Sequence, residues 1–189
     1  RAGTTLGVEV FHVVNRMAFS NHLDIAVDAF EITDMPMKRF PPLEEALVAE
    51  RKAIAAFEAA KAGPYIAMRN AELAMFGAQN TVGFARLVAD GYRSPELPGE
   101  VQIIRLGDTC IVTLQGEAFV EIGLAIKAAS KAAKTFVLET SNGYAPGYLY
   151  TEQAGREGGY EVGTSMFASD AGNHVVSIIK EKLSCSHSK

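Results

Sequence analysis

The chain has 189 residues, of which 48% are hydrophobic, and its formal net charge is −4. That length suits one domain with its own core, and the pI of about 5.6 excludes the strongly basic surface typical of nucleic-acid-binding proteins. No apolar run approaches the roughly 18 residues of a membrane span, and no signal peptide is visible, so we expect a soluble domain.

Two strands are expected first, over residues 6–14 and 22–33. In the second of these, apolar residues alternate with polar or small ones, which is the period of a half-buried strand. Ser20 and Asn21 supply turn-forming side chains between the two segments. We therefore expect these strands to form an antiparallel pair.

Two helices are expected next. The first begins after Pro41-Pro42 and ends at Gly63-Pro64, and its apolar residues recur at helical spacing. The second covers residues 71–88. Residues 91–100 are rich in Pro and Gly and are interpreted as an ordinary connection.

The remaining elements predict an α/β unit. Residues 101–106 and 109–114 form a hairpin around Gly107-Asp108, because Gly supplies the positive φ of a two-residue turn. A helix over 118–130, a strand over 135–140 and a last helix over 171–183 follow. The fold class is thus α/β, with a mixed sheet, a strand–helix–strand crossover and packed helices. Residues 1–183 are expected to form a single domain, and residues 184–189 a frayed tail.

Cysteine and histidine usage points to no metal site by itself. Cys110 falls in a buried strand and Cys185 in the polar tail, so two free thiols are expected. The four histidines include no pair at i, i+4 spacing and no HExxH motif, so none is assigned as a ligand; they are His12, His22, His174 and His187. The chain also contains neither a GxSxG nucleophile elbow nor a phosphate-binding glycine loop.

Polar residues follow the two strands that the crossover joins. Glu117 comes after the strand 109–114, and Tyr144 and Tyr148 come after the strand 135–140. The carboxyl ends of parallel strands lie at one edge of a sheet, where ligand sites of α/β sheets usually form. We therefore expect Glu117 to approach Tyr144, Tyr148 or both. The alternatives are a carboxylate that stabilises a helix N-terminus and tyrosines that merely pack on the sheet end.

Several short motifs in this region occur in a fixed order. They are Gly116-Glu117-Ala118-Phe119, then Asn142-Gly143-Tyr144 with Gly147-Tyr148, then Thr151, and then Tyr160-Glu161. In this order and spacing, residues 100–165 resemble the neutral/alkaline non-lysosomal ceramidases and their bacterial relatives.

The resemblance implies a zinc-dependent amide hydrolase that cleaves ceramide, a lipid amide, into sphingosine and a fatty acid. In that family, zinc is held by two histidines, a glutamate and a tyrosine. Glu117 matches the glutamate, and Tyr148 matches the tyrosine, with Tyr144 as the alternative because Pro146 lengthens the spacing between the two. The implied catalytic and metal-binding residues are therefore Glu117 and Tyr148. Zinc would polarise the amide carbonyl and lower the pKa of its bound water toward about 7.

The family's two histidines belong to earlier segments, and neither His12 nor His22 stands in a recognisable family motif. We therefore expect this chain to be the later segment of a larger catalytic domain and to be inactive alone. Two other functions remain open. One is a non-catalytic binding or assembly domain that keeps the fold, and the other is a related hydrolase of another amide or ester.

Overall fold

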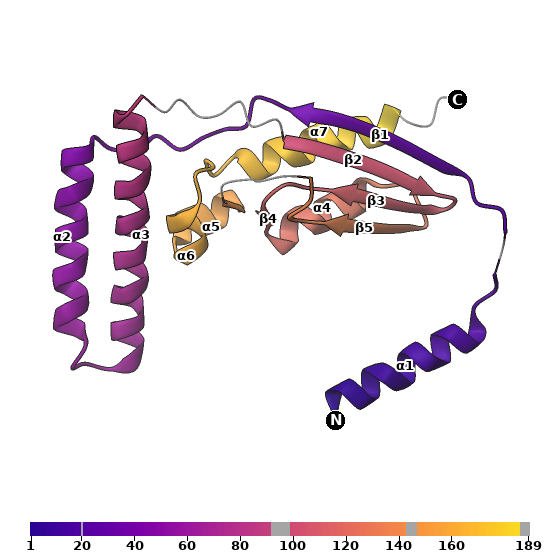
Figure 1. Cartoon of the computed structure of the whole chain (residues 1–189), viewed down its shortest axis with the longest axis horizontal. Coiled ribbons are helices and arrows are strands. Elements are labelled where there is room, and N and C mark those ends of the chain that lie inside the picture. The colour runs from indigo at the N-terminus through magenta and orange to yellow at the C-terminus, as the bar shows by residue number, and fades with distance from the viewer. Residues whose placement is uncertain (20, 92–98, 143–146, 186–189) are drawn as a thin grey trace.

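The fold is taken from a computed structural model, which describes residues 1–19, 21–91, 99–142 and 147–185 (Figure 1). A four-stranded sheet and its helices form the body of the molecule. A helical hairpin, made of α2 (Leu43–Ala60) and α3 (Tyr65–Ala89), projects from this body, and α1 (Ala2–Arg16) lies apart from it.

The main sheet has the strand order β1-β2-β3-β5. Its strands are β1 (Ile25–Ile32), β2 (Gly99–Leu106), β3 (Thr109–Thr113) and β5 (Lys134–Leu138). β1, β2 and β3 pair antiparallel, whereas β3 and β5 pair parallel and are joined through α4 (Val120–Ala129). The predicted α/β class, with its mixed sheet and strand–helix–strand crossover, is confirmed.

One face of this sheet carries the main hydrophobic core. α4 and α7 (Ala171–Cys185) pack against it, so that side chains from strands and helices are removed from water together. Among the most deeply buried residues are Ile103, Val112, Leu114, Ile126 and Ile179. Cys110 belongs to this core as a free thiol, as expected of it, and burial raises its pKa.

The prediction for residues 6–14 was wrong, because they lie in helix α1 instead of a strand. The segment alternates like a strand, but Leu6, Val10, Val13 and Val14 also stand at i, i+4, i+7 and i+8, which is one face of a helix. β1 consequently pairs with β2 and not with residues 6–14.

The other predicted elements are confirmed within a few residues. α2 begins directly after Pro42, and α3 begins at Tyr65, earlier than predicted, because Pro64 is accommodated just before the helix. Residues 92–98 of the predicted connection lie outside the described residues, and β2 begins at Gly99. α7 ends at Cys185, beyond the predicted end at residue 183.

Four short elements complete the chain: β4 (Glu117–Ala118), β6 (Tyr148–Leu149), α5 (Glu152–Glu157) and α6 (Tyr160–Thr164). β4 and β6 form a separate two-stranded parallel sheet beyond the ends of β3 and β5. Within the described ranges, no helix has both the length and the apolar character needed to cross a bilayer.

Candidate functional site

The two-stranded sheet brings the predicted pair together. β4 and β6 are parallel and in a register that sets Glu117 opposite Tyr148 and Ala118 opposite Leu149. The Phe119 amide donates to the Leu149 carbonyl oxygen at 2.8 Å. Residues directly opposite on adjacent strands project to the same face. Glu117 and Tyr148 therefore meet at the edge that the crossover predicts, where Glu117 is solvent-exposed and Tyr148 is half-buried.

The surroundings of Tyr148 keep its phenol protonated. Partial burial raises the pKa of Tyr148, and the Glu117 carboxylate raises it further through its negative charge and through the hydrogen bond that the phenol donates to it. Tyr160 and Glu161 act in the same direction. The rings of Tyr148 and Tyr160 stand edge to face, with centroids 6.3 Å apart. The site is thus a phenol–carboxylate pair flanked by a second tyrosine and a second carboxylate.

The backbone of Tyr148 is anchored by the side chain of Ser165, which is fully buried. The Ser165 hydroxyl donates to the Tyr148 carbonyl oxygen at 2.8 Å and accepts from the Phe167 amide at 3.1 Å. Gly147 allows this approach, because its φ is +115° and a Cβ built on it would lie 2.8 Å from the Ser165 Cα. Local sequence and packing therefore fix where β6 runs.

The loops after β3 and β5 are tied to each other by hydrogen bonds. Gln115 donates to the Asn142 carbonyl oxygen at 2.7 Å, and the Asn142 side chain donates to the Thr113 hydroxyl at 2.7 Å. The Glu139 carboxylate accepts from the Ala118 amide at 2.8 Å. Thr140 and Asn142 adopt positive φ values of 52° and 61°, and such backbone often marks functional sites. These contacts hold β4 against the end of the main sheet.

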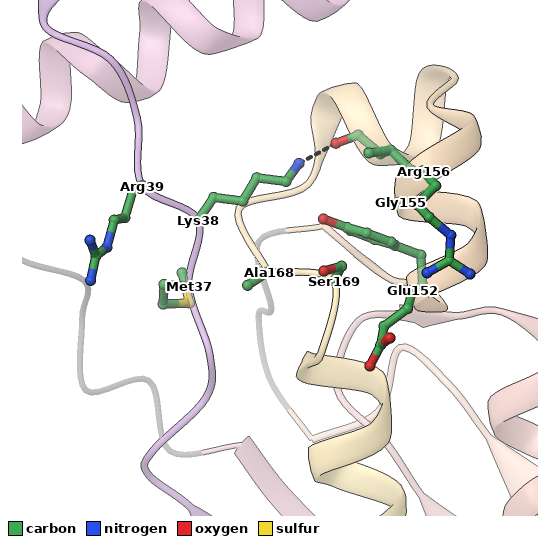
Figure 2. Close-up of a pocket in the computed structure, with 10 residues that line it drawn as sticks. Met37, Lys38, Arg39, Glu152, Gly155, Arg156, Ala168 and Ser169 are labelled. Carbon is green, nitrogen blue, oxygen red and sulfur yellow. Dashed lines mark hydrogen bonds between the residues drawn. The ribbon is translucent and has the colours of Figure 1, made fainter.

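Lys38 supports the segment that carries the flanking residues Tyr160 and Glu161. Its ammonium donates to the carbonyl oxygens of Val162 and Ser165, the latter at 2.8 Å, and burial lowers the pKa of Lys38 to about 8. Lys38 and Tyr150 both line a cavity of about 530 Å³, and Figure 2 shows the Lys38 side chain with its hydrogen bond drawn as a dashed line. Neither Glu117 nor Tyr148 lines this cavity, so the link of Lys38 to the pair runs through its hydrogen bonds to Val162 and Ser165.

The described histidines lie elsewhere. His12 is on α1, His22 is exposed and lies 3.6 Å from Asp24, and His174 is 3.0 Å from Asp34. Within residues 1–19, 21–91, 99–142 and 147–185, no three or more His, Cys, Asp or Glu side chains are grouped so that they could hold a metal. Catalytic zinc usually has three protein ligands and a water. Glu117 and Tyr148 supply two donors, so the described part of the chain does not complete a zinc site.

The structure describes some of the residues that the sequence analysis proposed for the site, but not all of them. Glu117 and Tyr148 come together as expected, whereas Tyr144 lies outside the described residues. The roles of Tyr160 and Glu161 beside Tyr148 were not assigned from the sequence. The signal for them was the Tyr-Glu pair in the motif series, which gives no position in space by itself.

Two solved structures are similar to part of this chain. One is a ceramidase complexed with C2, which is 20% identical, with a TM-score of 0.36. The other is a neutral ceramidase from Pseudomonas aeruginosa, which is 22% identical, with a TM-score of 0.35. Each match covers 43% of this chain and 14% of the ceramidase chain, so this chain spans only a small part of their length. No protein-family model and no curated protein sequence matches it.

Proposed function

We propose that this chain is the later segment of a ceramidase-like, zinc-dependent amide hydrolase and is inactive by itself. The observation that carries the proposal is the register of β4 and β6, which sets Glu117 opposite Tyr148. Both residues stand in the motifs that resemble the ceramidase family, at the positions of its glutamate and tyrosine ligands. The substrate class proposed is a lipid amide such as ceramide.

The chemistry of the pair supports this assignment. A carboxylate and a phenol are both oxygen donors, and both become better ligands when negatively charged. Glu117 supplies a carboxylate, and backbone anchors hold Tyr148 opposite it. The Glu117 charge raises the pKa of the Tyr148 phenol, so a bound cation would have to displace the phenolic proton for Tyr148 to act as a charged ligand. When a complete site binds zinc, the ion supplies Lewis-acid activation of the amide carbonyl. The two remaining protein ligands would come from histidines on sequence upstream of Arg1.

The test compares the 189-residue chain with a longer polypeptide that includes the upstream sequence of its gene. We expect the longer form to bind about one zinc ion per chain and to hydrolyse the amide bond of ceramide, since it alone has the full ligand set. Glu117→Gln and Tyr148→Phe in the longer form should each lower both zinc content and hydrolysis, by on the order of a hundredfold or more for the rate. Zinc is measured by elemental mass spectrometry and hydrolysis by fatty-acid release.

Glu121→Gln is the matched control, because Glu121 is another exposed carboxylate close by, in the first turn of α4. It should leave zinc content and hydrolysis unchanged. If Glu117→Gln retains both properties at the level of Glu121→Gln, the proposed role of the pair is wrong.

A non-catalytic binding or assembly domain is the second candidate. It is favoured by the ligand set of the described residues, in which no three or more His, Cys, Asp or Glu side chains are grouped so that they could hold a metal. Under this reading, the longer polypeptide folds but contains no stoichiometric zinc and releases no fatty acid from ceramide. The same two measurements therefore separate the two candidates, and a third result, hydrolysis of a different amide or ester, would identify a related hydrolase.

A further inference from the structure

The Lys38 ammonium lies at the C-terminal end of α6. It donates to the carbonyl oxygens of Val162 and Ser165, and it lies 5.3 Å from the centroid of the Tyr150 ring. The Val162 carbonyl is one of the last four of the helix, which have no partner within it, and Ser165 is the C-terminal capping residue. A cation at this end also interacts favourably with the helix dipole. Lys38 therefore caps α6 from a segment far away in the chain.

The backbone around Lys38 is itself fixed. The Lys38 amide donates to the Met166 carbonyl oxygen at 2.8 Å, and the Ala168 amide donates to the Pro36 carbonyl oxygen at 2.9 Å. These two bonds form an antiparallel bridge just beyond the end of α6. The side chain of Lys38 thus starts from a defined point beside the helix end that it caps. Each of these contacts joins two described residues of this chain, so the cap needs no residue from upstream sequence.

Helix α6 depends on such contacts because it cannot be stable by itself. It has five residues, none of them buried, whereas isolated helices shorter than about 12–15 residues are marginal in water. Along its length it lies close to α3, where a Cβ added to Gly163 would be 3.2 Å from the Gly77 Cα. At its C-terminal end it is held by Lys38. The first turn of this short helix carries Tyr160 and Glu161, so the cap also determines where these two side chains lie.

Lys38 connects α6 to β6 as well. Ser165, whose carbonyl oxygen accepts from Lys38, donates its hydroxyl to the Tyr148 carbonyl oxygen at 2.8 Å. One ammonium therefore links the two elements, and the rings of Tyr148 and Tyr160 that they carry stand edge to face, with centroids 6.3 Å apart. We propose that Lys38 is a positioning residue of the candidate site, which holds the first turn of α6 against Tyr148. Its effect on zinc binding rests on the proposed function, whereas its effect on the two rings does not.

The first test measures the nuclear Overhauser effect between the Tyr148 and Tyr160 rings in the 189-residue chain. It is made at pH 7, below the Lys38 pKa of about 8, so that the ammonium is charged. Lys38→Met keeps the apolar stem but removes both side-chain hydrogen bonds, so the signal between the rings should lose most of its intensity. Lys52→Met is the matched control, because Lys52 is exposed on α2, and it should leave the signal unchanged.

Circular dichroism shows whether Lys38→Met keeps its secondary structure. If it does not fold, Lys38→Gln takes its place, since a glutamine amide can still donate a hydrogen bond from a shorter, uncharged side chain, and the signal should again be reduced. A signal as strong as that of Lys52→Met, in whichever of the two Lys38 variants folds, overturns the proposal, because α6 then keeps its place without the ammonium.

The second test measures the zinc dissociation constant of the longer polypeptide by competition with a chelator. Lys38→Met should raise this constant by about tenfold or more, as expected for groups that orient metal ligands without touching the metal, and Lys52→Met should not change it. Equal constants for the two variants overturn the role of Lys38 at the site. If the longer polypeptide binds no zinc at all, the proposed function fails, and the ring signal of the 189-residue chain alone decides whether Lys38 positions α6.

Discussion

Replacing Gly147 by alanine tests how the backbone positions Tyr148. Gly147 has a φ of +115°, and a Cβ added there would lie 2.8 Å from the Ser165 Cα, a backbone atom that cannot rotate away. The substitution therefore costs about 1–3 kcal/mol for the backbone conformation and about 1–3 kcal/mol more for overpacking against Ser165. The clash between the added Cβ and Ser165 can be relieved only if β6 moves, and that movement would separate Tyr148 from Glu117.

Gly159→Ala is the matched control for this prediction. Gly159 has a similar φ of +109°, but a Cβ there would meet only a flexible carboxylate oxygen of Glu161, at 3.8 Å. It should show the conformational cost alone. Urea denaturation should therefore give a free energy of unfolding about 1–3 kcal/mol lower for Gly147→Ala than for Gly159→Ala. In thermal unfolding, each kcal/mol of this difference should lower the melting temperature by about 2–4 °C. Equal losses in the two variants would refute the close approach to Ser165.

Two further predictions concern the surroundings of the site. Burial lowers the pKa of Lys38 to about 8, so the unfolded chain binds more protons than the folded one between about pH 8 and 10, and this lysine makes stability rise with pH across that window. Lys38→Met should lessen that rise in urea titrations, and an unchanged pH slope would contradict the assignment. Ile103→Ala in the fully buried core should cost about 2–5 kcal/mol, whereas Ile66→Ala at an exposed position should change stability by no more than about 0.5 kcal/mol in the same assay.

The crossover was predictable from the sequence because it depends on local signals. Gly107-Asp108 marks the hairpin, and apolar periodicity marks the helix and strands, so the parallel pairing of β3 and β5 follows from connectivity rules. The approach of Glu117 to Tyr148 follows in turn from that pairing. Residues 6–14 were not predictable in the same way, since their apolar residues fit both a strand and a helix. No residue of α1 is buried, so packing within the described part of the chain gives little to decide between them.

The support behind the site depends on packing and has no local signature. Lys38 reaches the carbonyl oxygens of Val162 and Ser165 from a segment far away in the chain, and only the folded arrangement brings these groups together. Tyr160 stands beside Tyr148 for the same reason, because the short helix α6 turns back toward β6. A sequence pattern can name such residues in a motif, but it cannot place them around a shared point.

The backbone of β6 is anchored by hydrogen bonds that do not involve the side chains of Glu117 and Tyr148, so these side chains can be substituted without disturbing the anchors. The Ser165 hydroxyl and the Phe119 amide fix β6 through its carbonyl groups, independently of what the Glu117 and Tyr148 side chains do. Glu117 is itself exposed, and substitutions of exposed side chains usually change stability by no more than about 0.5 kcal/mol. A large loss of zinc or hydrolysis in Glu117→Gln would therefore report on ligand binding and not on unfolding, whereas a comparable loss in Gly147→Ala would report on the backbone that aligns the pair.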